Sequence, residues 1–242
     1  MTLQLIKTYI KKIKHRGTNY KCSICDSNLN LLLTAGLYEK RLNSKCPICG
    51  SLERHRQLWL ILNEKVSLEN KIILHFAPEK CLRKRLSQIQ SLEYRTSEYD
   101  NNSISDFHYD ITCINAPDNS FDLIVCSHVL EHIDNDMLAM SELFRILKND
   151  GVALIQVPIH KELSQVTYEN PTIISKEDRI KYFGQFDHVR IYGLDIEKRL
   201  KNAGFSVSRL DLTETYSEKD AEYLGLINYS GVKDYTFICQ KR

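Results

Sequence analysis

Four cysteines near the start of the chain have the spacing of metal ligands. Cys22 and Cys25 form one CxxC pair, Cys46 and Cys49 form a second, and twenty residues separate the pairs. A CxxC turn presents two thiolates to one ion, and two such turns complete a tetrahedral shell around Zn²⁺. Because four thiolates leave no coordination position open, the pattern predicts a structural zinc site rather than a catalytic one.

A second group of polar residues follows a short apolar run. Residues 123–126 (LIVC) are apolar, and Ser127, His128, Glu131 and His132 come directly after them. Such a run predicts a buried parallel strand, and ligands bind at the carboxyl ends of parallel strands. His128 is therefore expected in a site at this end, where an imidazole can act as a base. His132, one turn further on, is more simply explained by capping or packing.

The same stretch carries a family resemblance. Residues 121–124 (FDLI) and 128–133 (HVLEHI) resemble the fourth strand and following loop of class I S-adenosylmethionine-dependent methyltransferases, and residues 142–151 (ELFRILKNDG) resemble their helix and LKPGG turn. The resemblance covers residues 66–242. It implies an α/β fold: a Rossmann-like, doubly wound, mostly parallel seven-stranded sheet, preceded here by a small zinc-knuckle appendage. It also implies an enzyme with S-adenosylmethionine as its cofactor.

One turn departs from the family pattern. The family places ExGxGxG after its first strand, and glycines there let the backbone approach the cofactor. Here the predicted strand at residues 71–76 leads into Ala77, Pro78 and Glu79, without a glycine. The HFAPE sequence at this point resembles a subgroup of these methyltransferases that carries CPxCGSxxRHR ahead of the domain. The resemblance therefore still implies that these three residues contact the cofactor.

The resemblance places further cofactor contacts after the next strands. Glu98, in preference to Asp100, is expected to accept the ribose hydroxyls, as an acidic residue does in dinucleotide folds. Asp110, with Ile111, aligns with the position that the family places against adenine, although a solvated loop aspartate is the alternative. The contacts expected at the methionine end are Ser127 and His128.

The methyl acceptor is expected in a polar insert of about thirty residues after residue 157. Its pattern lacks periodicity, and long loops inside compact domains usually have a function. The FGQFDHVRIYG sequence within it recurs in the same subgroup. His188 is the predicted general base, with His128 as the second catalytic candidate and His160 also considered. The predicted acceptor contacts are Asp187, Arg190 and Tyr168.

Two further segments allow two interpretations each. Residues 3–14 predict a basic amphipathic helix with Ile6, Ile10 and Ile13 on one face. Packing of this face on the body is the first interpretation, and contact with an anionic membrane surface or nucleic acid is the second.

Residues 54–56 (RHR) lie in a helix that is predicted to end near Lys65. They form either a solvated helix face or a contact for an anionic substrate.

Composition limits the possible partners. The chain has 242 residues and a formal net charge of +2, but residues 1–21 hold six basic and no acidic residues, which leaves 27 basic and 31 acidic side chains elsewhere. The body is therefore not a basic nucleic-acid binder. No apolar run is long enough for a transmembrane segment, so a cytoplasmic protein is expected. The predicted divisions are a basic arm (1–21), a zinc knuckle with a linking helix (22–65) and a methyltransferase domain (66–242).

The leading functional hypothesis is methyl transfer from S-adenosylmethionine to an oxygen or nitrogen of a small molecule, such as a sugar or glycan precursor. One alternative is an RNA base methyltransferase that holds RNA with its zinc knuckle and basic arm. The other is a non-catalytic binding module whose cofactor site has degenerated together with its glycines.

Overall fold

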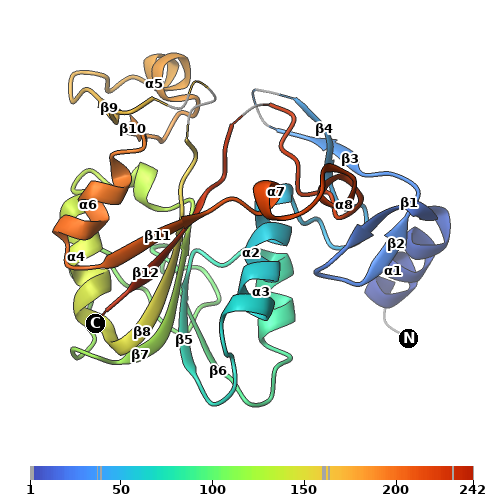
Figure 1. The fold of residues 1–242 in the computed structure, drawn as a ribbon, viewed down its shortest axis with the longest axis horizontal. Helices are drawn as coiled ribbons and strands as arrows, with labels where there is room; N and C mark the ends of the chain where they lie inside the picture. The colour runs from blue at the N-terminus through green and yellow to red at the C-terminus, as the bar shows by residue number, and fades with distance from the viewer. Residues whose placement is uncertain are drawn as a thin grey trace. The chain divides into compact units, whose positions relative to one another are not determined.

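Short apolar runs of the sequence become neighbouring strands of one sheet. In this computed structural model, which describes residues 3–36, 38, 40–159, 162, 164–230 and 232–241, six strands pair in the order β11-β12-β8-β7-β5-β6 (Figure 1). The strands β6, β5, β7 and β8 run parallel, and β12 is antiparallel to both of its neighbours. Their bounds are β5 (Ile72–Phe76), β6 (Glu93–Ser97), β7 (Phe121–Ser127), β8 (Leu147–Gln156), β11 (Ser206–Leu210) and β12 (Thr236–Gln240).

The mostly parallel α/β sheet is as predicted, but it has six strands among the described residues instead of seven. Beyond β6, only Phe107 pairs, through a single parallel bridge to Ser97. The carboxylate of Asp106 accepts the Thr96 backbone N–H at 2.8 Å, the donor that a longer neighbouring strand would use. At this point of the edge a side chain thus takes the place of a further paired strand.

The sheet lies in the larger of two compact units. This unit, unit 2, consists of residues 69–78, 90–210 and 231–242; unit 1 consists of residues 1–68, 79–89 and 211–230. In unit 2, α4 and α6 cover one face of the sheet (Figure 1). Fully buried side chains of the sheet and these helices form its core, among them Ile124, Leu143, Ile155, Leu200 and Phe237. The helices of this unit are η1 (Leu130–His132), α4 (Asp136–Ile146), α5 (Lys176–Phe183) and α6 (Ile196–Asn202).

The polar insert is more ordered than its sequence indicated. Instead of one long loop it contains α5 and a small antiparallel pair, β9 (Tyr168–Glu169) with β10 (Arg190–Ile191). The Ser175 hydroxyl accepts the Asp178 backbone N–H at 3.0 Å and so caps the start of α5. Gly184, at φ +82°, ends the helix in the left-handed conformation that favours glycine. Local capping thus forms a helix where the apolar periodicity is weak.

Unit 1 is built from short hairpins and helices. Strand β1 (Arg16–Cys22) pairs with β2 (Ser27–Leu29), and β3 (Leu33–Ala35) pairs with β4 (Arg41–Lys45), both antiparallel. Its helices are α1 (Leu3–Lys14), α2 (Glu53–Lys65), α3 (Lys80–Leu86), α7 (Leu212–Thr215) and α8 (Glu218–Tyr223). Among the helices described in both units, none has the length and apolar character needed to cross a bilayer.

Two of the three basic residues at the start of α2 are buried, so the interpretation as a solvated face is wrong for His55 and Arg56. Arg56 is fully buried, and His55 is 6% exposed. The Arg56 guanidinium donates to the carbonyl oxygens of Ser51 and Ser44, each at 2.8 Å, and to that of Gly225. Because these backbone acceptors use all three of its nitrogens, Arg56 fixes the structure of unit 1 and is not placed to bind an anionic substrate.

Candidate functional site

The carboxyl ends of three parallel strands meet at one edge of the sheet in unit 2. Phe76 at the end of β5 is in register with Ser97 of β6 and with Cys126 of β7. The Ala77 backbone N–H donates to the Ser97 carbonyl oxygen at 2.8 Å, which continues this alignment into the turn. The residues predicted to bind the cofactor after β5, β6 and β7 therefore share this edge.

The turn after β5 takes a glycine-like conformation without a glycine. Ala77 has φ +45°, in the left-handed region where a β-carbon is unfavourable, and its side chain is exposed. Pro78 is buried behind it. Alanine adds only one methyl group, so the turn keeps much of the backbone access that the family obtains from glycine. Glu79 begins a segment of unit 1, where its carboxylate lies 3.5 Å from His55 Nε2.

Glu98 directly follows β6 at this edge. It is half-buried, and its carboxylate makes no hydrogen bond or ion pair with the described residues, while His108 holds its carbonyl oxygen at 3.1 Å. Asp110 is exposed, and the hydrogen bond from the Thr112 hydroxyl lowers the pKa of its carboxyl. Ile111 is 4% exposed and belongs to the core. The ribose and adenine contacts of these two carboxylates stay predictions.

Ser127 and His128 at the end of β7 are held by other side chains. Ser127 is buried and donates to Gln156 Oε1 at 3.1 Å. His128, at φ +54°, has Nδ1 3.1 Å from Glu131 Oε1 and Nε2 3.3 Å from Asp234 Oδ1. With a carboxylate beside each ring nitrogen, His128 is better placed to position Glu131 than to abstract a proton from an acceptor.

His188 and His132 lie together beside Glu131. Their ring centroids are 4.7 Å apart. Although burial raises it, the pKa of the Glu131 carboxyl is lowered overall, because His128 and the other nearby imidazoles favour the anion. Burial lowers the pKa of His188, which favours its neutral, basic form at neutral pH. The structure thus brings the predicted base together with two residues that sequence reasoning did not assign to a site.

Two neighbours of His188 were predicted to contact the acceptor, and the structure separates them. Asp187 Oδ2 lies 3.4 Å from His132 Nδ1, so it borders this group. Arg190 is only 3% exposed; its guanidinium donates to Glu169 at 2.8 Å and to backbone carbonyls of η1 and the turn after it. The acceptor role predicted for Arg190 is therefore wrong, because every guanidinium nitrogen is already bonded.

Two further residues, Tyr168 and His160, were considered for the acceptor region. Tyr168 is 45% exposed and packs its ring 5.8 Å from that of Phe183, so its role as an acceptor contact stays a prediction. His160 lies outside the described residues.

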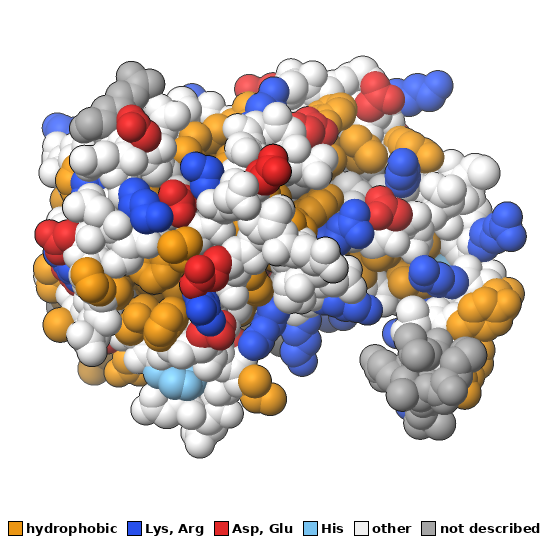
Figure 2. Space-filling model, turned by 90° about the horizontal axis from the view of Figure 1, so that it is seen from below, with side chains coloured by type: hydrophobic (Ala, Val, Ile, Leu, Met, Phe, Trp, Pro, Cys, Tyr) orange, Lys and Arg blue, Asp and Glu red, His pale blue; other side chains and the backbone are white. Residues whose placement is uncertain are grey.

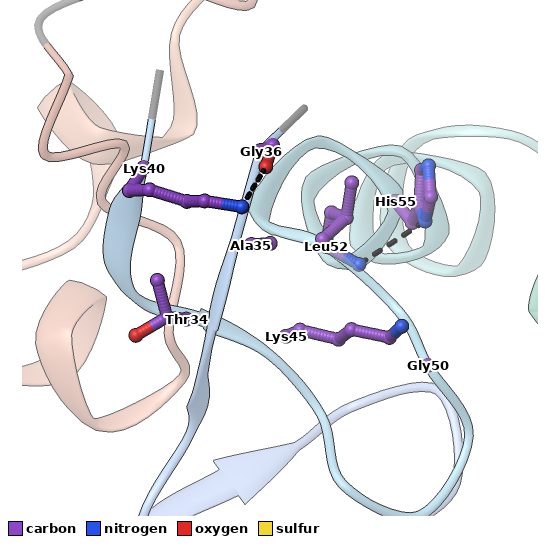
Figure 3. A pocket seen from close by; sticks show the side chains of 8 residues that line it. All are labelled: Thr34, Ala35, Gly36, Lys40, Lys45, Gly50, Leu52 and His55. Carbon is purple, nitrogen blue, oxygen red and sulfur yellow. Dashed lines mark hydrogen bonds between the residues drawn. The ribbon is translucent and has the colours of Figure 1, made fainter. Parts of the chain in front are cut away.

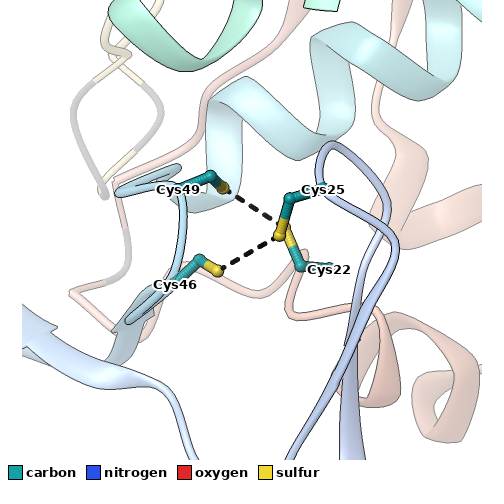
Figure 4. A group of neighbouring side chains, drawn as sticks. All are labelled: Cys22, Cys25, Cys46 and Cys49. Atoms are coloured by element: carbon teal, nitrogen blue, oxygen red, sulfur yellow. Dashed lines mark hydrogen bonds between the residues drawn. The ribbon is translucent and has the colours of Figure 1, made fainter. Parts of the chain in front are cut away.

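The four cysteines of unit 1 form a cluster (Figure 4). The sulfur atoms of Cys22 and Cys49 are 3.6 Å apart, and those of Cys25 and Cys46 are 3.8 Å apart. A tetrahedral ion with metal–sulfur bonds of about 2.3 Å requires sulfur–sulfur distances of about 3.8 Å. Hydrogen bonds with the neighbouring thiols, Cys25 first, lower the pKa of Cys22. The sulfur positions therefore fit one tetrahedral metal ion.

A separate hollow of about 630 Å³ lies in unit 1 (Figure 3). Its polar lining includes Lys40, which donates to the Gly36 carbonyl oxygen at 3.1 Å, and His55, which accepts the Leu52 N–H at 3.1 Å. The full lining is Thr34, Ala35, Gly36, Lys40, Lys45, Gly50, Leu52 and His55. None of the predicted cofactor or acceptor residues lines it, so it is distinct from the site at the sheet edge.

Residues 81–155 match a family model described as a methyltransferase domain. The chain carries a methyltransferase domain. The matched segment contains β6, β7 and α4 and reaches to the end of β8, and it includes Glu98, Asp110, His128 and Glu131. Together with the fold, this match confirms the prediction of a class I S-adenosylmethionine-dependent methyltransferase.

Solved structures share the fold of this methyltransferase domain. An S-adenosylmethionine-dependent methyltransferase from Archaeoglobus fulgidus aligns with 79% of this chain and 95% of its own, at 17% identity and a TM-score of 0.51. One from Mesorhizobium loti aligns with 76% of this chain and 97% of its own, at 10% identity and a TM-score of 0.52. The [4+2]-cyclase SpnF aligns with 77% of this chain and 80% of its own, at 14% identity and a TM-score of 0.54. These likenesses establish the fold alone.

A curated relative matches over a shorter stretch. An uncharacterised protein of Methanocaldococcus jannaschii is 41% identical over 68 residues, which is 27% of this chain. The match spans 29% of the relative's own length.

Proposed function

We propose that the methyltransferase domain transfers a methyl group from S-adenosylmethionine to an oxygen or nitrogen atom of a small molecule, with a sugar or glycan precursor as the expected class. The observation that carries this proposal is the Glu98 carboxylate, which lies at the sheet edge without a described protein partner, beside the left-handed Ala77 turn. A carboxylate in this position can accept two ribose hydroxyls.

Residues at this edge would each hold one part of the cofactor, which supplies an electrophilic methyl group on sulfur. Glu98 would bind the ribose, Asp110 the adenine, and the backbone at Ala77 and Pro78 would pass close to the nucleoside. Ser127 and His128 would border the methionine end. The protein's contribution to such a transfer is mainly positioning and exclusion of water, together with removal of a proton from an oxygen acceptor. We assign that last task to the group formed by His188, His132 and Glu131.

The charge distribution supports a small acceptor over a polynucleotide. Outside residues 1–21, acidic side chains outnumber basic ones by 31 to 27. A polynucleotide would require a basic surface for its phosphates. If RNA were the acceptor, binding would fall steeply with salt, and deletion of residues 1–21 would abolish activity.

We also propose that the four-cysteine cluster holds a structural Zn²⁺. Its sulfur spacing matches a tetrahedral shell, and Ile48 donates its backbone N–H to Cys46 Sγ at 3.4 Å. Four thiolates fill the coordination sphere, so this ion would stabilise unit 1 and take no part in methyl transfer.

Replacing Glu98 with alanine should weaken binding of S-adenosylhomocysteine about a hundredfold. The reason is the loss of two charge-assisted hydrogen bonds to the ribose, worth about 3 kcal/mol together. Isothermal titration calorimetry on the purified full-length protein measures this directly. Glu93→Ala is the matched control, because Glu93 is an exposed carboxylate at the start of the strand that Glu98 follows, paired with Arg95 at 2.9 Å.

The same titrations separate the competing functions. Equal affinity in the wild type and Glu98→Ala would contradict the proposed cofactor contact. No heat with the wild type at millimolar S-adenosylhomocysteine would leave the non-catalytic binding module as the explanation of this fold.

A further inference from the structure

Glu131, His132 and His188 bring three metal-ligating groups together after the end of β7. One possible ligand atom of each lies within 4.8 Å of the others. Glu131 and His132 belong to η1, which follows β7, whereas His188 comes from the loop between α5 and β10. One carboxylate and two imidazoles form a ligand set that binds divalent first-row transition metals.

Both histidines are oriented as metal ligands usually are. His188 Nδ1 lies 3.0 Å from the Phe183 carbonyl oxygen, which can only accept, so Nδ1 carries the proton and Nε2 keeps its lone pair. His132 Nδ1 likewise faces the carbonyl oxygen of Asp187 at 3.3 Å and its carboxylate at 3.4 Å. Metal-bound histidines commonly donate their second ring nitrogen to a carbonyl or carboxylate in this way.

The third group is a buried carboxylate with an unused oxygen. Glu131 is fully buried; its Oε1 lies 3.1 Å from His128 Nδ1, and its Oε2 has no hydrogen bond to the described residues. A buried carboxylate oxygen without a donor is costly. A cation bound between Glu131 and the two histidines would satisfy it, and His128 would then position the ligand from behind.

We propose that Glu131, His132 and His188 bind a divalent transition-metal ion of the Mn²⁺, Fe²⁺ or Zn²⁺ kind. Three protein ligands leave coordination positions open, as in catalytic metal sites. Metal binding at this site does not depend on the proposed methyl transfer, but the role of the metal does. In that role, hydroxyl oxygens of the acceptor occupy the open coordination positions. The acceptor is then a polyol that is methylated on oxygen. In this arrangement the three side chains act on the acceptor proton through the ion and not as a free base: the ion lowers the pKa of the bound hydroxyl, which gives its proton to water. Its new C–O bond forms as the C–S bond of the donor breaks, with the electron pair left on sulfur.

Binding of Mn²⁺ tests the site without donor or acceptor. Mn²⁺ prefers oxygen and nitrogen ligands, so the four thiolates of unit 1 compete poorly for it. The purified full-length protein, freed of loosely held metal, should bind one Mn²⁺ per chain, as followed by loss of the free-ion electron paramagnetic resonance signal. Glu131→Gln and His188→Gln should each weaken binding at least about tenfold. His15→Gln, which changes a histidine of the other unit, should leave it unchanged.

Two results would overturn this site. One is the absence of Mn²⁺ binding to the wild type up to millimolar concentration; the other is unchanged affinity in variants that keep their circular dichroism. If Glu131→Gln does not fold, His188→Gln decides, because His188 is only half-buried. Calorimetry with S-adenosylhomocysteine on the same samples distinguishes the two proposals. If the protein binds S-adenosylhomocysteine but not Mn²⁺, the metal site is refuted and the proposed methyl transfer is not.

A second surface, in unit 1, leads to an independent inference. Among the described side chains of α1, three apolar ones are exposed: Ile6 by 41%, Ile10 by 57% and Ile13 by 62%. The prediction that this face packs on the body is therefore wrong for these residues. Figure 2 shows hydrophobic side chains on the surface at the right of the view, beside the grey residues, where α1 lies. Of the side chains described in this helix, only Thr8 is half-buried.

We infer that α1 binds an anionic lipid surface. Lys7, Lys11, Lys12 and Lys14 accompany the exposed apolar face, and residues 1–21 contain no acidic side chain. A basic helix with an apolar face lies in the interface of an anionic bilayer, where each lysine contributes about 1 kcal/mol. Binding to RNA phosphates would use the lysines but would leave the isoleucines in water.

Co-sedimentation of the full-length protein with vesicles tests this inference. Vesicles of phosphatidylcholine and phosphatidylglycerol should bind the protein, and vesicles of phosphatidylcholine alone should not. Replacing Ile10 and Ile13 with asparagine should reduce the bound fraction at least about tenfold, whereas Leu42→Asn, at a residue 65% exposed on β4, should not. Unchanged vesicle binding in the double variant overturns the inference, as does a wild type that binds only an RNA oligonucleotide or only a second copy of itself.

Discussion

Replacing Cys46 with serine is expected to release the metal ion proposed for the four-cysteine cluster and to unfold the hairpins of unit 1. Structural zinc sites of this kind contribute free energy on the order of 10 kcal/mol, and the binding energy is folding energy for a segment with little core of its own. Cys46 is central because its sulfur lies 3.8 Å from that of Cys25 and also accepts the Ile48 N–H. Zinc content by mass spectrometry and limited proteolysis of the hairpins measure the outcome.

Cys113→Ser provides the control, because Cys113 is an exposed thiol in unit 2. It should leave zinc content and proteolysis unchanged. A wild-type protein purified without bound metal, yet resistant to proteolysis in its first fifty residues, would refute the zinc proposal and with it this prediction.

Replacing Arg56 with leucine is expected to destabilise the protein by about 4 kcal/mol, because it leaves buried acceptors without their donor. Arg56 donates to the carbonyl oxygens of Ser44 and Gly225, and to both the carbonyl and the hydroxyl oxygen of Ser51. Ser51 Oγ in turn lies 3.3 Å from Cys22 Sγ, so the guanidinium is linked to the thiolates. Four thiolates around the proposed Zn²⁺ would carry a net negative charge, which would account for a buried arginine that has no carboxylate partner among the described residues.

Urea denaturation followed by circular dichroism measures the loss, and Lys65→Leu on the same helix is the control, since Lys65 is exposed. The variant should also release zinc to a chelator faster than the wild type does. A change in stability below about 1 kcal/mol would show that water replaces the guanidinium, and would remove its assigned role.

The centre of the sheet was predictable because β5, β7 and the second half of β8 are buried on both faces. Their mostly apolar runs have few alternative structures, whereas the edge strands β6 and β11 are more exposed. The hairpins of unit 1 give no such signal: β1, with the sequence RGTNYKC, is mostly exposed and polar. The proposed metal site at its end, rather than an apolar core, explains how such a strand is held.

At the site, sequence reasoning found residue types but not their partners. The cysteine spacing indicated a cluster, because each CxxC turn brings its own two thiolates together and one metal ion can join the two turns. For Arg190, a charge beside a histidine suggested an acceptor contact, yet its partners lie in η1 and β9, far away in the sequence. Glu131 was missed as a ligand, although a glutamate inside the apolar turn HVLEHI is a detectable signal for a buried carboxylate.

Unit 1 takes its last piece, residues 211–230, from near the end of the chain. During synthesis Arg56 therefore leaves the ribosome long before Gly225, whose carbonyl oxygen it will bind. The hairpins could form early around the proposed ion, but the guanidinium gains its last acceptor only after residue 225 has been synthesised. A nascent chain that stalls before residue 225 would expose the incomplete unit 1 to quality-control proteases, so synthesis of residues 211–230 completes the first unit.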